Sequence, residues 1–427
     1  MNKKSNVFYA LLSLPATAMG FALCVQIATL SWILNTKYNL NLEEIGFVWL
    51  AGPLAGILGQ VIFGVISDKV WFWNGRRRPF IIIGGTIAGL MILALPFIDV
   101  INETLGIGSI IGVAITVALT LDLAINISFN PARSIIADVT EEGEARTKGF
   151  TWMQTISGFF GVLAYLIGAF IGNYELIYIG AFFVLACSII PVFFIEEPRE
   201  LDAPKTEEET ITRTETDWVA FLKICFAHAF TWVGVQCMFI YTFAYIKENI
   251  MGFGTNDSLT DIQNNEIGFS IGIAFAILNT VGFILPAFVL EPVAEKIGRV
   301  KTHTLAIAIM AIGYGLLVAF GGTMTSFFLL MAVVGVGWAA VVSLPFAIMS
   351  EVVNQKKMGL MMGLFNLSVV LPQIVASQLG GFINTQPNKN MIFIISAIAL
   401  GLSAVFWLLV KEQKENVSND GIVAGGH

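Results

Sequence analysis

The chain has 427 residues, of which 56% are apolar and only 12% are charged, and its mean hydropathy is +0.80. Soluble domains carry about 25% charged residues, so this composition excludes a soluble globular protein and indicates an integral membrane protein. The formal net charge of −7 gives no indication of nucleic-acid binding.

Apolar windows long enough to cross a membrane recur twelve times along the chain. A hydrocarbon core of about 30 Å requires about 20 such residues in a helix. The first window follows a basic start and is too long for a signal peptide, so we expect it to remain as a span. The predicted spans are 7–34, 46–67, 79–99, 108–131, 148–172, 175–195, 218–245, 266–290, 302–320, 326–350, 358–383 and 391–411.

A charged segment without an apolar face separates the sixth span from the seventh. The loops "GVISDKVWFWNGRRRPF" and "LEPVAEKIGRVKTH", after the second and eighth spans, form a weak repeat, as expected of a duplicated transporter. We therefore predict an all-α integral membrane fold of twelve transmembrane helices in two six-helix halves. The predicted parts are an N-terminal half (1–195), a cytoplasmic linker (196–217), a C-terminal half (218–411) and a cytoplasmic tail (412–427).

The distribution of Lys and Arg predicts the orientation in the membrane. If the N-terminus is cytoplasmic, all of the 23 basic residues except Lys37, Lys247 and Lys389 fall on the cytoplasmic side. Cytoplasmic loops carry such an excess. We expect a multi-pass protein of the cell (inner or plasma) membrane with both termini in the cytoplasm.

The fourth span, "ALTLDLAINISFNPARS" at 118–134, carries Asp122 near the expected bilayer midplane. A carboxylate there costs about 2.5–3.5 kcal/mol on insertion scales, and such residues usually face a bundle interior or a water-filled cavity. Arg133 lies eleven residues further on, on nearly the same face but roughly 16 Å along the helix. Asp122 is thus a candidate functional acid. The alternative is a structural acid satisfied by backbone groups or by neighbours such as Asn126.

Several segments resemble one branch of the major facilitator superfamily. The loop "SDKVWFWNGRRRPF" is similar to the cytoplasmic loop between the second and third helices of that superfamily, and its Arg-Arg-Arg-Pro-Phe run resembles sucrose transporters. The segment "LDLAINISFNPARSIIAD" resembles their fourth helix, and "GVGWAAVVSLPFAIMS" and "MGLMMGLFNLSVVLPQIVAS" resemble helices ten and eleven. The seventh span lacks an acidic residue that some plant members carry.

The resemblance implies proton-coupled uptake of a disaccharide, such as the α-glucosides maltose or sucrose, by alternating access. Asp122 matches the proton-coupling carboxylate of the family, and Arg133 would favour proton release near the cytoplasmic mouth. Loss of hydration favours a neutral carboxyl group, which can donate a hydrogen bond to a sugar hydroxyl. We expect no covalent chemistry, metal or cofactor, the proton being the coupling ion, and a monomer in contact with sugar and membrane lipid.

Three alternatives stay open at this point. The protein could be a sodium-coupled or uncoupled sugar carrier of the melibiose type. The second span carries no charge between Glu44 and Asp68, however, and one isolated acid suits a proton better than sodium. It could also export apolar compounds. An enzyme or a channel would need a catalytic cluster or a continuous polar stripe, and we find neither in the sequence.

Sugars are bound by hydrogen bonds to hydroxyl groups and by aromatic rings against C–H faces. Amides and tryptophans within the spans are therefore candidate contacts, with hydrogen bonding between helices as the alternative for each amide. The candidates are Gln26, Asn126, Gln154, Trp232, Gln236, Asn279, Trp338, Asn366 and Gln373.

The resemblance also implies a cytoplasmic gate built from Asp68 and Arg76, with Asp138 as a possible partner. Other residues have simpler interpretations. Arg77 and Arg78, like Trp71, Trp73 and Trp407, are expected to anchor the chain at the membrane surface. His228 is expected to be a packing histidine rather than part of a proton path, and glycines such as Gly52 and Gly56 to allow close helix contact.

Overall fold

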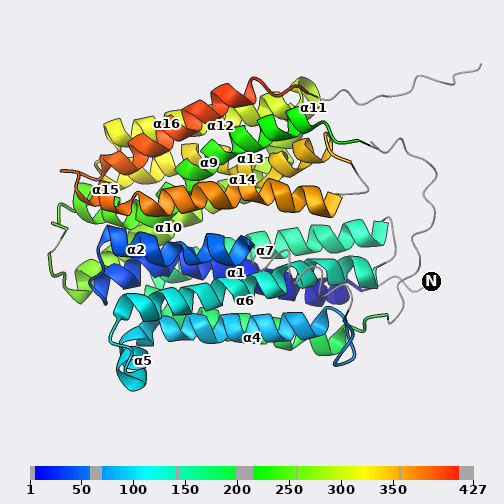
Figure 1. Cartoon of the computed structure of the whole chain (residues 1–427), viewed down its shortest axis with the longest axis horizontal. Helices are drawn as coiled ribbons and strands as arrows, with labels where there is room; N and C mark the ends of the chain where they lie inside the picture. Colours follow the sequence, from blue (N-terminus) through cyan, green and yellow to red (C-terminus); the bar gives the residue numbers. More distant parts are fainter. Residues whose placement is uncertain are drawn as a thin grey trace, which may run out of the picture.

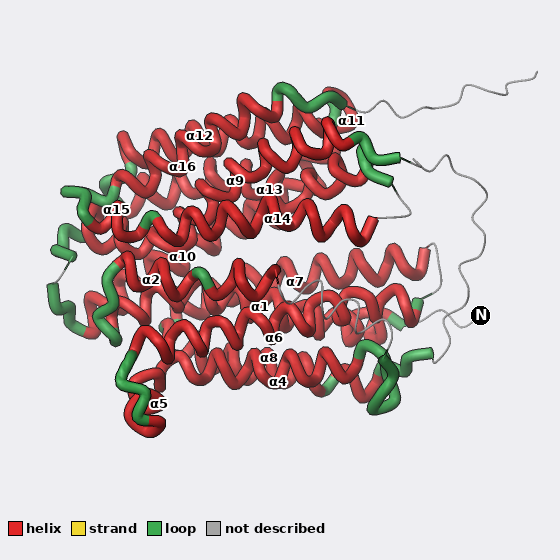
Figure 2. Tube along the Cα trace, viewed as in Figure 1, coloured by secondary structure: helices red, strands yellow, loops and turns green. Residues whose placement is uncertain are grey.

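The computed structural model of this chain describes residues 5–57, 70–140, 144–198, 215–255, 257–354 and 358–412. These residues form a bundle of long helices and contain no strand, only an isolated bridge between Phe72 and Gly75 (Figure 2). Eleven described helices are long and apolar enough to cross a membrane, and each overlaps most of one predicted span. The other predicted span, 46–67, begins in helical residues and then leaves the described part. The predicted all-α membrane fold is confirmed.

The helices fall into two sequential groups, which we call the N-terminal and C-terminal halves (Figure 1). The N-terminal half contains α1 (Asn6–Thr36), α2 (Leu42–Trp49), α4 (Arg78–Ala94), η1 (Leu95–Phe97), α5 (Ile98–Leu105), α6 (Ile110–Val139), α7 (Glu144–Phe170), α8 (Asn173–Ile189) and η2 (Pro191–Phe194). The C-terminal half contains α9 (Trp218–Ala244), η3 (Tyr245–Ile250), α10 (Asp261–Leu285), η4 (Pro286–Leu290), α11 (Glu291–Ile297), α12 (Arg299–Phe320), α13 (Met324–Ser350), α14 (Met358–Gln378), α15 (Gly380–Asn384) and α16 (Asn390–Trp407).

Side-chain caps fix where several helices begin. The Asn41 side chain accepts hydrogen bonds from the N–H groups of Glu43 and Glu44, and Glu44 accepts the Asn41 N–H in return. Thr260 and Gln263 form the same reciprocal arrangement at the start of α10. Such caps satisfy N–H groups that have no partner within the helix, so polar residues in the loops determine these helix starts.

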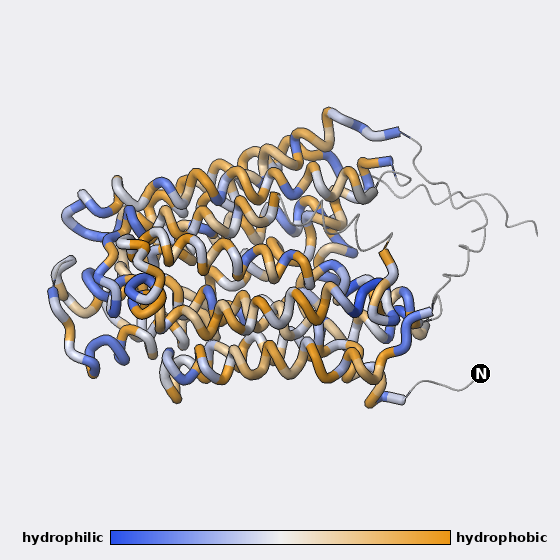
Figure 3. The backbone as a smooth tube through the Cα atoms, turned by 60° about the horizontal axis from the view of Figure 1, so that its bottom comes forward, coloured by the Kyte–Doolittle hydropathy of each residue, from blue (hydrophilic) through white to orange (hydrophobic). Residues whose placement is uncertain are grey.

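The apolar composition appears on the outside of the bundle as well as in its core. Figure 3 shows hydrophobic residues along the lengths of the helices and hydrophilic ones gathered at the two ends. Large apolar side chains in several parts of the bundle expose more than two thirds of their surface, as expected where a protein contacts a membrane. They include Phe170, Phe182, Phe193, Phe288 and Leu408. This outer surface suits contact with lipid chains.

The two ends of the bundle differ in charge. At one end, which we call the basic end, α1, α4 and α12 begin, and it carries Arg76–Arg78, Lys148, Arg299 and Lys301. The opposite end carries Lys37, whose Nζ lies 3.2 Å from a carboxylate oxygen of Asp99, together with Lys247 and Lys389.

The two halves press against each other at the opposite end. α2 packs against α14 and α15, and a Cβ atom on Gly46 or on Gly380 would overlap a backbone oxygen of the other half. The indole N–H of Trp32 in α1 donates to the backbone oxygen of Asn264 in α10 at 2.9 Å. Backbone contact this close needs glycine. Because the two halves touch directly through these residues, the opposite end is closed.

At the basic end, each half has a glutamate after its last helix whose carboxylate caps the start of an earlier helix. Glu197 accepts the backbone N–H groups of residues 76–78 at 2.8 Å each, at the start of α4. Glu412 accepts those of Arg299 and Val300 at 2.7 and 2.9 Å, at the start of α12. A negative charge at a helix N-terminus also interacts favourably with the helix dipole.

Candidate functional site

The centre of the N-terminal half holds one buried acid. Asp122 lies in the middle of α6 and is 6% exposed. Its Oδ2 accepts a hydrogen bond of 3.0 Å from Nε2 of Gln26 in α1, and no described residue forms an ion pair with it. An ionised carboxylate that is buried with only a neutral donor keeps a large desolvation cost, which binding a proton removes.

A third element, the segment 51–57 that follows α2, completes the surroundings of this carboxylate. A Cβ atom on Gly52 would lie 3.5 Å from Oδ2 of Asp122, so the backbone there faces the acid directly. Sequence reasoning assigned Gly52 to close helix contact in general and missed its relation to Asp122. No spacing rule connects the two residues, because they lie on different helices.

Asn126 and Arg133 lie on α6 beyond Asp122, toward the basic end. Asn126 donates from Nδ2 to the backbone oxygen of Asp122 at 2.8 Å, which leaves its side-chain oxygen for another donor. Arg133 is exposed, and its guanidinium carbon lies 4.0 Å from the centroid of the Phe129 ring, a cation–π arrangement. Arg133 therefore presents a positive charge on the same helix as the acid without pairing with it.

The C-terminal half brings four of the predicted polar and aromatic residues into two pairs. Nε2 of Gln373 in α14 donates to Oε1 of Gln236 in α9 at 3.3 Å. The indole N–H of Trp338 in α13 donates to Oδ1 of Asn279 in α10, also at 3.3 Å. These side chains therefore form hydrogen bonds between helices. For the amides, this is the alternative to sugar contact that the sequence left open. The amides of Gln236, Asn279 and Gln373 still have donors or acceptors to spare.

Trp232 joins the second of these pairs. Its ring meets that of Trp338 edge to face, with centroids 6.4 Å apart, and its N–H donates to Nε2 of His228 at 2.9 Å. His228 is buried and stacks on Phe365. The histidine is therefore a packing residue that also orients Trp232, a role that sequence reasoning missed.

The last two candidate contacts are not tied to these pairs. Gln154 in α7 is exposed and Asn366 in α14 is half-buried. Neither side chain forms a hydrogen bond to another residue in the part of the chain that the structure describes.

Of the three predicted gate residues, the structure describes Arg76 and Asp138. Asp68 lies outside the described residues. Nε of Arg77 donates to Oδ2 of Asp138 at 3.0 Å, and both side chains are largely buried. The interpretation of Arg77 as a membrane-surface anchor is therefore wrong, because it ties the start of α4 to the end of α6. Arg76 meets Glu197 through its backbone N–H.

Trp407 also differs from its predicted role. It is fully buried, and its ring meets His303 edge to face with centroids 4.4 Å apart. An interfacial anchor must reach the membrane surface, so that interpretation is wrong for Trp407. Sequence position near a span end could not show which way the ring points around the helix. Trp73, in contrast, is 63% exposed.

A helical bundle with an apolar outer surface and with buried polar groups in both halves defines a multi-pass membrane protein. The chain belongs to the Major Facilitator Superfamily, whose sequence profile matches residues 11–377 and 261–424. It is accordingly a transporter and not an enzyme.

Curated relatives of this chain carry the name of sucrose transport proteins. Sucrose transport protein SUT5 of Oryza sativa subsp. indica is 23% identical, over 99% of this chain and 90% of its own length. SUT1 of Oryza sativa subsp. japonica is 25% identical, over 96% and 89% respectively. SUC4 of Arabidopsis thaliana is 24% identical, over 77% and 75%.

Solved structures support the fold. The nucleoside transporter NupG superposes with a TM-score of 0.68 at 12% identity, covering 96% of this chain and 100% of that one. A bacterial homologue of the iron transporter ferroportin in an inward-facing state gives 0.67 at 14% identity, covering 95% and 99%. At these identities, the two solved structures share with this chain the arrangement of the helices.

Proposed function

We propose that the protein takes up a disaccharide together with a proton, by alternating access, and that the sugar is an α-glucoside such as maltose or sucrose. The observation that carries this proposal is the buried carboxylate of Asp122, bound to a neutral amide and without a cation among the described residues. The sucrose transport proteins among its relatives support a sugar as the substrate.

Hydrogen-bond chemistry links the proton to the sugar. An ionised Asp122 can only accept, as it does from Gln26. A protonated Asp122 can donate to a sugar hydroxyl, and Gln26 is then free to turn to the same sugar. Sugar and proton therefore strengthen each other's binding. When the site opens toward the basic end, water and the positive charge of Arg133 favour release of the proton.

The proposed sugar contacts come from both halves. Gln26, Asn126 and Gln154 belong to the N-terminal half, and Trp232, Gln236, Asn279, Trp338, Asn366 and Gln373 to the C-terminal half. Because a sugar between the halves would bridge these two sets, rocking of one half against the other exposes it to either side.

The charge asymmetry of the two ends supports an orientation. We place the basic end in the cytoplasm, with both termini, and the opposite end outside the cell membrane. The contacts between α2 and α15 then close the entrance from outside. We further propose that the working unit is a monomer.

Uptake of labelled maltose and sucrose into proteoliposomes with an imposed pH gradient tests the proposal. The wild type should accumulate sugar, and Asp122→Asn should lose gradient-driven accumulation because the amide cannot take up and release a proton. Asp99→Asn is the matched control, since it makes the same chemical change at a carboxylate that is 40% exposed and pairs with Lys37.

The outcomes separate the alternatives. If Asp122→Asn concentrates sugar as well as the wild type does, the proton role of Asp122 is wrong. Uptake that follows a sodium gradient and ignores the pH gradient identifies a sodium symporter. If purified protein binds no sugar, the proposed substrate class is wrong and an exporter of apolar compounds becomes the better account.

A further inference from the structure

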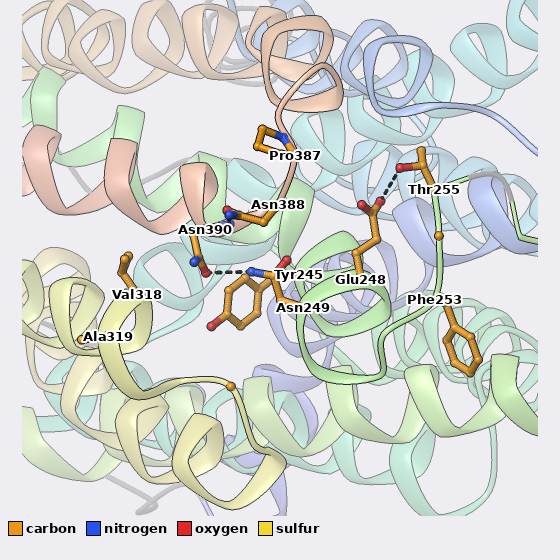
Figure 4. A pocket seen from close by; sticks show the side chains of 12 residues that line it. Tyr245, Glu248, Asn249, Phe253, Thr255, Val318, Ala319, Pro387, Asn388 and Asn390 are labelled. Carbon is orange, nitrogen blue, oxygen red and sulfur yellow. Dashed lines mark hydrogen bonds between the residues drawn. The ribbon is translucent and has the colours of Figure 1, made fainter.

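A polar cavity of about 550 Å³ opens at the opposite end of the molecule, within the C-terminal half (Figure 4). Its wall combines residues of η3, the end of α12 and the loop before α16. The volume is in the range of about 300–1,000 Å³ that small-molecule sites occupy. None of the residues assigned above to the sugar and proton site lines it.

The cavity wall is held in place by hydrogen bonds between its own side chains. Asn249 donates from Nδ2 to Oδ1 of Asn390 at 2.7 Å and accepts the backbone N–H of Lys389 at 2.9 Å. Within the described residues, the side-chain nitrogens of Asn388 and Asn390 have no hydrogen-bond acceptor. They are thus fixed donors that are available to a ligand.

A buried ion pair lies beside the cavity. Nζ of Lys389 is 3.2 Å from Oε2 of Glu248, and the lysine side chain is 1% exposed. The other carboxylate oxygen of Glu248 accepts from the Thr255 hydroxyl at 3.1 Å. Because Glu248 is neutralised by Lys389, the wall carries no net charge from this pair. It suits a neutral ligand with hydroxyl groups better than a cation.

The helical segment that carries Glu248 and Asn249 has an unusual geometry. η3 is a six-residue π-helix, a rare form that occurs frequently at functional sites. It contains no proline that would account for it, unlike η4, which begins at Pro286. Lys247 in η3 also donates from Nζ to Oδ1 of Asn35 in the other half at 3.3 Å. The cavity therefore borders the contact that closes the opposite end.

We propose that this cavity is a second binding site for a neutral sugar, on the side from which the sugar enters. The inference rests on the proposed sugar uptake. The amides of Asn388 and Asn390 donate to sugar hydroxyls, a Glu248 oxygen accepts from one, and the half-buried ring of Phe253 offers an apolar face. Because the cavity lies within one half, it persists while the halves rock and holds sugar near the entrance.

Equilibrium binding of maltose and sucrose to the purified protein, with uptake from the opposite side, tests this site. Ala319→Trp fills the cavity without removing a polar group, since Ala319 lines it. Phe320→Trp is the matched control, because Phe320 is 66% exposed and does not line the cavity. Asn388→Ala is a second variant, at an exposed side chain.

We expect two sugars per chain in the wild type and in Phe320→Trp, and one in Ala319→Trp. In Asn388→Ala the second sugar should bind about two- to tenfold more weakly, as for the loss of one hydrogen bond. Both cavity variants should raise the KM for uptake and leave kcat unchanged. One sugar per chain in every protein, with equal KM, overturns the second site while sugar uptake stands. No sugar binding at all overturns both proposals.

Discussion

Three segments meet around the carboxylate of Asp122, and each contributes something different. α6 carries the acid, Gln26 in α1 supplies a neutral donor at 3.0 Å, and Gly52 leaves room on the third side. A charged partner in place of Gln26 would hold the carboxylate ionised permanently. The neutral donor and the small residue together place no fixed positive charge beside the acid, as the proposed exchange of a proton requires.

Substitutions at Gly52 test this arrangement in graded steps. A Cβ atom there would lie 3.5–3.8 Å from the carboxylate atoms of Asp122, which is ordinary contact. Gly52→Ala should therefore retain most proton-driven uptake, whereas Gly52→Leu should displace the carboxylate and lower uptake to the level of Asp122→Asn. Uptake in proteoliposomes measures both.

Gly20→Leu serves as the control for this series, because a Cβ atom on Gly20 meets nothing within 4 Å. Its uptake should match the wild type. Full uptake by Gly52→Leu would show that the acid does not depend on space at this position.

At the scale of elements, the carboxylates Glu197 and Glu412 perform the same task in the two halves. Each lies after the last membrane helix of its half and accepts backbone N–H groups at the start of α4 or α12. Those N–H groups have no partner within the helix. The two halves thus share a structural device at the basic end that the weak sequence repeat only partly revealed.

Removing one of these caps should destabilise the protein. Glu197→Ala leaves three backbone N–H groups without their charged acceptor, so we expect the free energy of unfolding to fall by about 1–3 kcal/mol. Chemical unfolding in detergent and the thermal midpoint both report the change. Glu196→Ala is the matched control, since the neighbouring Glu196 is exposed. Equal stability of the two variants would contradict the cap.

For the whole molecule, closure of the opposite end depends on backbone contact between the halves. Gly46 in α2 lies against Ser377, and Gly380 in α15 lies against Leu42. Two polar contacts add to it, from Trp32 to Asn264 and from Lys247 to Asn35. The proposed alternating access requires that all of these contacts break and re-form as one unit.

A bulky residue at this contact should prevent closure. In Gly380→Leu the side chain would overlap the backbone of Leu42, so we expect the opposite end to stay open and uptake to fall to background. Distances between spin labels placed across that end should increase. Gly401→Leu, where a Cβ atom meets nothing within 4 Å, should transport and close normally. Closure of Gly380→Leu to the wild-type distance would disprove this account.

The contrast between Asp122 and Arg77 shows how far sequence reasoning reaches. Asp122 stood out because a charge within an apolar span is costly and therefore informative by itself. Arg77 lies in a loop with two other arginines, where position alone favours an anchor, and only the structure shows it buried against Asp138. The prediction for Trp407 was wrong for a similar reason. Its position near the end of a span was clear from the sequence, but the direction in which its ring points around the helix was not.

The sequence by itself determined the all-α membrane fold and the positions of the described spans, because hydrophobic length and polar caps act within a short stretch of chain. Partners far apart in the chain, such as Gln26 for Asp122 or Glu197 for the start of α4, depended on how the helices rotate and pack. The tertiary structure alone decided which end of the bundle is closed. Contact between the halves joins residues hundreds of positions apart, and no local pattern records it.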